Sequence, residues 1–138
     1  MRDAIALARQ WAEMDDGDLA KIDSSRYNSL STLQKVKVLD HLRLASNALS
    51  HEKLAHLDKV NKFSKAGNYD ILSSWIQLGL KNYWEDIIPL ALDFVTKQGR
   101  LKYVRPIYNA GRAIETFMKN APYMHPITVS TVSKLIPK

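Results

Sequence analysis

Two histidines and a glutamate lie close together in residues 51–56, which read His-Glu-Lys-Leu-Ala-His. The zinc peptidase signature is His-Glu-x-x-His, in which both histidines bind the metal from one helix face and the glutamate acts as general base. Here the second histidine comes one residue late, so His51 and His56 would lie about 140° apart around a helix and could not share one metal ion. We expect instead that Ser50 caps a helix, that Glu52 favours its positive end, and that both histidines are solvated.

A second stretch whose residues could bind a ligand reads Lys-Gln-Gly-Arg-Leu-Lys-Tyr-Val-Arg-Pro, residues 97–106. Gly99 can take the left-handed conformation that ends a helix, and Pro106 disfavours helical backbone at Arg105. The pattern therefore predicts a short non-helical segment after Gly99 and a new helix that begins at Pro106.

Side chains alternate along an extended segment, so Arg100 and Lys102 would point one way, and Leu101 and Tyr103 the other. A planar guanidinium and a compact ammonium that converge in this way could bind one carboxylate. The residues alone leave a second interpretation open, in which both cations complement the negative end of the preceding helix and are otherwise solvated.

Length and composition limit the classes of protein to consider. The 138 residues suffice for one domain with a core, and the absence of cysteine excludes disulfides and thiol nucleophiles. The opening residues turn acidic after one helix length, so we expect neither a signal peptide nor a membrane span, and a cytoplasmic protein. Residues 1–96 carry 12 Lys/Arg against 13 Asp/Glu, whereas residues 97–138 carry 8 against Glu115 alone, which makes this last part strongly basic.

The elements that must position these groups are nearly all predicted to be helices. The first covers residues 3–14, with Asp3 as its N-cap and Gly17 after its end. Ser31-Thr32-Leu33-Gln34 is a capping box that begins a second helix. A third runs from about Ser50 to Phe63, with Gly67 as its stop.

Asn68 is expected to cap a fourth helix, and a fifth follows Asn82 and ends at Gly99. Pro89 falls inside the fifth apolar stripe and predicts a kink or a helix boundary there. A last helix is expected to begin at Pro126. Seven or more helices with short connections indicate an all-α fold, a bundle or an α-solenoid, in which Trp75 and Trp84 belong to the core.

Three stretches carry a family resemblance: Trp84-Glu85-Asp86-Ile87-Ile88-Pro89-Leu90-Ala91-Leu92, the segment Gln98–Pro106, and Met124-His125-Pro126-Ile127-Thr128. Together they resemble the C-terminal domain of the leukotriene A4 hydrolase/aminopeptidase family of zinc metallopeptidases. The resemblance extends over almost the whole chain, from Arg9-Gln10-Trp11 to Ser133-Lys134, and its first half matches mainly by helical pattern.

The resemblance implies that residues 1–138 form a single domain, a two-layered α-α superhelix of about seven to nine short helices, similar to ARM and HEAT repeats. It also implies that the zinc ligands and catalytic residues belong to a separate catalytic domain that this chain lacks. The chain itself would hold no cofactor, and its partner would be that catalytic domain. Arg100 and Lys102 match the basic pair that binds the carboxylate of a short peptide, or of a fatty-acid epoxide, while Arg105 is expected to be structural.

Two other functions remain open. A stand-alone α-solenoid could bind a protein partner through its basic face. Nucleic-acid binding ranks below it, because the chain has no recognisable helix-turn-helix, zinc finger or RNP motif.

Overall fold

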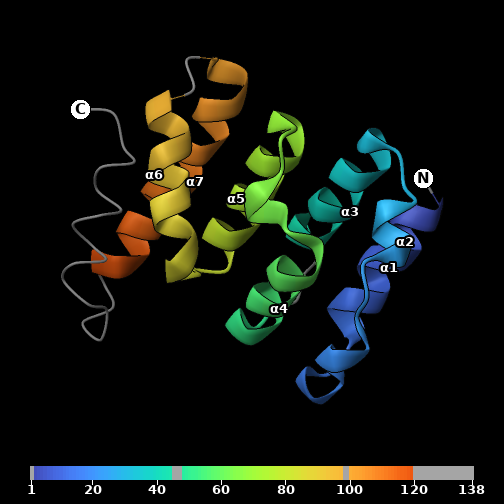
Figure 1. The fold of residues 1–138 in the computed structure, drawn as a ribbon. Helices are drawn as coiled ribbons and strands as arrows, with labels where there is room; N and C mark the ends of the chain where they lie inside the picture. Colours follow the sequence, from blue (N-terminus) through green and yellow to red (C-terminus); the bar gives the residue numbers. More distant parts are fainter. Residues whose placement is uncertain (1, 45–47, 98–99, 120–138) are drawn as a thin grey trace. The chain divides into compact units, whose positions relative to one another are not determined.

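The protein is described from a computed structural model, which covers residues 2–44, 48–97 and 100–119. Within these ranges the chain forms seven α-helices and three short 3-10 helices, with no strand (Figure 1). The all-α class expected from the sequence is therefore confirmed. The chain divides into two compact units, residues 1–78 and 79–138. The superhelical arrangement stays a prediction.

The first unit is built from α-helices joined by short turns. Its elements are α1 (Arg2–Glu13), η1 (Asp16–Lys21), α2 (Ser25–Asn28), α3 (Thr32–Leu44), α4 (His51–Asn61), η2 (Phe63–Lys65) and the first part of α5 (Tyr69–Lys81). Helix α1 packs against α3, and α4 contacts both η1 and η2. The short elements η1 and α2 were not expected from the sequence.

Three helix starts form as their capping residues predict. The amide of Ser31 donates to Oε1 of Gln34 at 2.9 Å, and the amide of Gln34 donates back to Oγ of Ser31 at 3.2 Å. Oγ of Ser50 accepts from the amide of Lys53 at 3.0 Å. Oδ1 of Asn68 accepts two amide hydrogens of the first turn of α5, at 2.8 and 3.2 Å. Each cap satisfies amides that have no partner inside the helix.

The end of α4 differs from the prediction that Gly67 stops it. The helix ends at Asn61, and Lys62 takes the left-handed conformation, with φ 57°. The amide of Lys62 donates to the carbonyl of Asp58 at 2.7 Å, which is the bond of a left-handed cap. The carboxylate of Asp58 also accepts from the amide and hydroxyl of Ser64, at 2.8 and 2.6 Å. These bonds hold a turn that normally favours glycine.

The expected cap of α1 is also wrong. Asp3 lies within the first turn of the helix, which includes Arg2, and the helix ends at Glu13. The carboxylate of Asp3 is therefore placed to favour the positive end of the helix rather than to cap it.

Four aromatic rings form the centre of the first unit. Phe63 packs against Tyr27 with ring centroids 5.0 Å apart and against Trp75 at 4.6 Å, while Trp11 lies 6.1 Å from Tyr27. All four are buried, which confirms the core position expected for Trp75. The indole of Trp75 donates to Oγ of Ser64 at 3.1 Å. Burial raises the pKa of the Tyr27 phenol, so the ring is neutral in the folded state.

A buried lysine joins α4 to the end of α1. The side chain of Lys53 is 5% exposed, and its Nζ donates to the carbonyl of Ala12 at 3.2 Å. Helix α1 has no basic residue in its own last turn. Lys53 therefore supplies the positive charge that the negative end of α1 favours.

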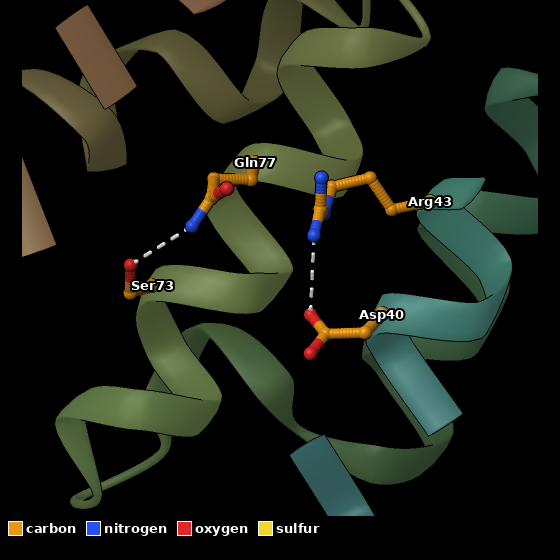
Figure 2. Close-up of polar contacts among 4 residues, drawn as sticks. All are labelled: Asp40, Arg43, Ser73 and Gln77. Atoms are coloured by element: carbon orange, nitrogen blue, oxygen red, sulfur yellow. Dashed lines mark hydrogen bonds and ion pairs between the residues drawn. The ribbon is translucent and has the colours of Figure 1, made fainter. Parts of the chain in front are cut away.

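Helices α3 and α5 each carry a polar side-chain pair (Figure 2). The side chain of Arg43 extends from α3 towards α5, and its Nη2 lies 3.7 Å from Oδ1 of Asp40. On α5, Nε2 of Gln77 donates to Oγ of Ser73 at 3.2 Å. Asp40 and Arg43 are about one-third exposed, so this pair is partly screened by water.

The second unit consists of the end of α5, η3 (Glu85–Ile87), α6 (Ile88–Lys97) and α7 (Leu101–Lys119). Pro89 lies in the first turn of α6, where its missing amide costs no helical hydrogen bond, so the predicted boundary is confirmed. Trp84 is 8% exposed, as expected for a core residue. Helix α6 contacts both η3 and α7.

Helix α5 ends in a turn that brings η3 close to its last residues. Tyr83 is left-handed, with φ 55°, and the amide of Trp84 donates to the carbonyl of Gly79 at 3.0 Å. The amide of Tyr83 donates to the carbonyl of Leu80 at 3.0 Å, which completes a Schellman motif. A Cβ atom at Gly79 would lie 2.8 Å from Cγ1 of Ile87 and 2.9 Å from its Cβ.

We predict that Gly79→Ala lowers the free energy of unfolding by about 1–3 kcal/mol, because the buried Ile87 must move to admit the methyl group. Urea denaturation of the two proteins measures the difference. The matched control is Gly67→Ala, because a Cβ atom there meets nothing within 4 Å. Equal effects of the two substitutions would contradict the close packing of α5 against η3.

We predict that Lys53→Met, which keeps the length and packing of the side chain, lowers the free energy of unfolding by about 1–2 kcal/mol, because the carbonyl of Ala12 loses its charged donor. Lys59→Met, at an exposed position on the same helix, should change it by less than about 0.5 kcal/mol. Thermal and urea unfolding measure both. If Lys53→Met leaves the free energy of unfolding unchanged, the hydrogen bond contributes no net stability.

Candidate functional site

The backbone around the predicted basic pair is helical rather than extended. Helix α7 begins at Leu101, and Pro106 lies inside it instead of starting it. Pro106 cannot donate the helical hydrogen bond to the carbonyl of Lys102 and disfavours helical backbone at Arg105. The lost hydrogen bond and the disfavoured backbone are offset by the burial of apolar side chains on α7. Tyr103, Val104 and Ile107 are 7%, 5% and 0% exposed. This apolar face requires helical spacing to reach the core.

Arg100 is the residue directly before α7, and its backbone is tied to the helix. Its carbonyl accepts from the amides of Tyr103 at 3.1 Å and Val104 at 3.2 Å. The position of Arg100 relative to the first turn of α7 is therefore fixed by two hydrogen bonds. The side chains of Arg100 and Lys102 are both exposed.

The two cations converge on one aromatic ring. Cζ of Arg100 lies 5.6 Å from the ring centroid of Tyr103, and Nζ of Lys102 lies 5.1 Å from it. Tyr103 in turn packs edge to face against Phe94 of α6, with centroids 6.2 Å apart and planes at 86°. A buried ring thus supports two exposed cations, and each attraction to the ring is worth about 0.5–1 kcal/mol.

The electrostatic setting of this basic pair is unusual for a helix start. The N-terminal end of a helix carries partial positive charge, which favours acidic side chains and disfavours basic ones. The first turn of α7 has no acidic residue. Arg100 and Lys102 therefore add positive charge to an end that is already positive, and the combination favours an anion close to both side chains.

Residues 51–56 form the start of α4. Ser50 caps this helix as expected, and its Oγ also donates to Oδ1 of Asp16 at 2.9 Å. His51 is exposed as expected, whereas His56 is half-buried. His56 and Glu52 line an open depression of about 470 Å³ beside η1.

The described part of the chain does not fit a zinc site. Within residues 2–44, 48–97 and 100–119, no three His, Cys, Asp or Glu side chains are grouped so that they could hold a metal ion. Within the same ranges, no helix combines the length and the apolar character needed to cross a membrane.

Comparison with known proteins gives the family. Residues 30–136 match the family model described as leukotriene A4 hydrolase, C-terminal. The chain belongs to this family. The match includes α3 to α7 and therefore the basic pair at the start of α7.

Individual curated proteins align over nearly the whole chain. Leukotriene A-4 hydrolase of Xenopus laevis is 33% identical over 139 residues, which cover 94% of this chain. Leucine aminopeptidase 2 of Aspergillus niger is 31% identical over 134 residues, and that of Ajellomyces capsulatus is 30% identical over 135 residues. The chain spans about a fifth of the length of these curated relatives, at 22% of each.

Parts of the motifs that carry the resemblance lie outside the described residues. These are Gln98 and Gly99, and also Met124–Thr128, with the helix expected to begin at Pro126. The residues of the basic pair are described.

Tyr103 is the residue of the site that sequence reasoning missed. An extended backbone would have turned its ring away from both cations, whereas the helix brings it under them. Its spacing of three residues from Arg100 was the available signal, because residues three apart are neighbours on a helix. Arg105, expected to be structural, is exposed on α7.

Proposed function

We propose that this chain is the non-catalytic C-terminal domain of a zinc aminopeptidase or leukotriene A4 hydrolase-like enzyme, and that Arg100 and Lys102 bind the carboxylate of its substrate. The substrate would be a short peptide, or a fatty-acid epoxide in an enzyme that hydrolyses one. The observation that carries the proposal is the convergence of two exposed cations on the ring of Tyr103 at the positive end of α7.

The chemistry of this pair suits a carboxylate. A guanidinium can donate two parallel hydrogen bonds to the two oxygens, and an ammonium adds a compact charge from a second direction. The ring of Tyr103 limits the directions that both side chains can take, which lowers the entropy lost when a ligand binds. A fixed clamp of this kind aligns the scissile bond without taking part in the chemical step.

The role of the domain would be to close one end of an active-site cleft that it shares with a catalytic domain of the same polypeptide. The zinc implied by the family would then be held by that catalytic domain. Among the described residues, no group of His, Cys, Asp or Glu side chains could hold it. A clamp at a fixed distance from the reacting bond would favour short peptides over long ones. This arrangement also gives a role to the basic residues at the start of α7.

A second candidate is a protein-binding helical module that acts without a catalytic domain. It is favoured by the exposed basic residues that continue along α7, Lys102, Arg105 and Arg112. Intact mass spectrometry of the native polypeptide separates the two. A product several times larger than 15.7 kDa supports the enzyme, and a product of this size supports the module.

We predict that Arg100→Ala in the full-length polypeptide lowers kcat/KM for tripeptides by roughly 10- to 100-fold, the loss expected when a charged hydrogen bond to the substrate is removed. The midpoint of thermal unfolding should fall by only a few degrees, because the exposed side chain loses no more than its attraction of about 0.5–1 kcal/mol to the Tyr103 ring. Arg9→Ala, which removes an exposed cation from α1, is the charge-matched control and should leave kcat/KM unchanged. An unchanged kcat/KM of Arg100→Ala for tripeptides would contradict the proposal.

We predict that Lys102→Ala raises KM for tripeptides several-fold and changes kcat less, because the ammonium contributes charge rather than bidentate orientation. Steady-state kinetics on a tripeptide and on its C-terminal amide give the check. The amide should already have a raised KM with the unmodified enzyme, and Lys102→Ala should add little to it. Equal KM values for the acid and the amide with the unmodified enzyme would argue against a carboxylate clamp.

A further inference from the structure

The ring of Tyr103 supplies negative charge density to the basic pair, as well as bulk. An aromatic ring is negative on its faces and positive along its edge. Cζ of Arg100 and Nζ of Lys102 lie over the ring, 5.6 and 5.1 Å from its centroid, and a ring attracts a cation within about 6 Å. The ring therefore attracts both cations electrostatically, in addition to limiting the space available to them.

This attraction opposes the forces that would drive the two cations apart. Both charges lie within 5.6 Å of one ring centroid, so they repel each other. The positive end of α7 repels both as well, and the first turn of the helix has no acidic side chain. The face of the Tyr103 ring provides negative charge density at the point on which the pair converges.

Phe94 of α6 holds the plane of the Tyr103 ring. The two residues are 5% and 7% exposed, and their rings meet at 86° with centroids 6.2 Å apart. This edge-to-face arrangement is favoured because the positive edge of one ring meets the negative face of the other. A cation is attracted to the face of a ring, so rotation of the Tyr103 ring would weaken both of its cation contacts. The contact with Phe94 opposes that rotation.

We infer that the electron-rich face of Tyr103, in the plane held by Phe94, positions Arg100 and Lys102 for the substrate carboxylate. Tyr103 and Phe94 are then positioning residues of the carboxylate site. This inference rests on the proposed function and adds an electrostatic role for the ring to its steric one. It requires that binding of the carboxylate weakens when the ring loses electron density, even if its shape is kept. A ring that only filled space would not respond in this way.

The test varies the electron density of the ring in the full-length polypeptide. Tyr103→Phe is the reference, and further variants carry at this position a phenylalanine with one, two or three ring fluorines, which withdraw charge from the ring face and change its size little. We expect KM for the tripeptide Ala-Ala-Ala to rise with each fluorine, to roughly three- to tenfold at three fluorines, as two cation contacts weaken together. KM for the C-terminal amide of the same tripeptide should stay constant, because the amide has no carboxylate for the cations to hold.

Phe94→Leu tests the second positioning residue. It keeps an apolar side chain at a buried position but removes the edge-to-face contact. We expect it to raise KM for Ala-Ala-Ala several-fold and to reduce the difference in KM between acid and amide. Phe63→Leu is the matched control, because it removes a buried ring from the first unit, where it packs against Tyr27 and Trp75. It should lower stability and leave the ratio of the two KM values unchanged.

The two substrates separate a failure of this inference from a failure of the proposed function. If KM for Ala-Ala-Ala does not depend on the number of fluorines, or rises equally for the amide, the inference is wrong. The clamp still stands in that case, provided that the unmodified enzyme distinguishes the acid from the amide. If the unmodified enzyme has equal KM values for both, or cleaves neither, the proposed function fails and the inference with it.

Discussion

The burial of the Tyr103 ring is the constraint on which the candidate site depends. Its edge-to-face contact with Phe94 packs the start of α7 against α6, and both cations lie within 5.6 Å of its ring centroid. The same burial decides the backbone, because the apolar face that includes Val104 and Ile107 can reach the core only from a helix. Local preferences at Pro106 are overridden for this reason. One packing contact therefore determines both the secondary structure and the placement of charge.

Local signals in the sequence predicted local structure well. Ser31, Ser50 and Asn68 cap helices because a short polar side chain can reach the free amides of the next turn whatever lies elsewhere. The boundary at Pro89 follows from covalent structure in the same way. The left-handed turn at Lys62 could not be predicted from the local sequence. It depends on Asp58 and Ser64, whose bonds form only once α4 and η2 are in place.

The candidate site was predicted in part. The residue types of Arg100 and Lys102 indicated a carboxylate, and their family resemblance gave the context, but the argument from alternating side chains was wrong. A helix and an extended strand can both bring two cations together, so the pair remains a candidate although the predicted backbone around it was wrong. The place of Tyr103 beside both cations could be interpreted only with the helix known. Lys53 is the opposite case, because its buried ammonium donates to the backbone carbonyl of Ala12.

Pro106 weakens the connection between the first turn of α7 and the rest of the helix. Because proline has no amide hydrogen, that turn is joined to the remainder of the helix by fewer hydrogen bonds than an uninterrupted helix would have. Opening it should require less free energy than opening the middle of the helix. Tyr103 belongs to that turn, and its contact with Phe94 holds the turn in place where the helical hydrogen bond is missing. The position of the cations therefore depends on side-chain packing more than on the helical hydrogen bonds.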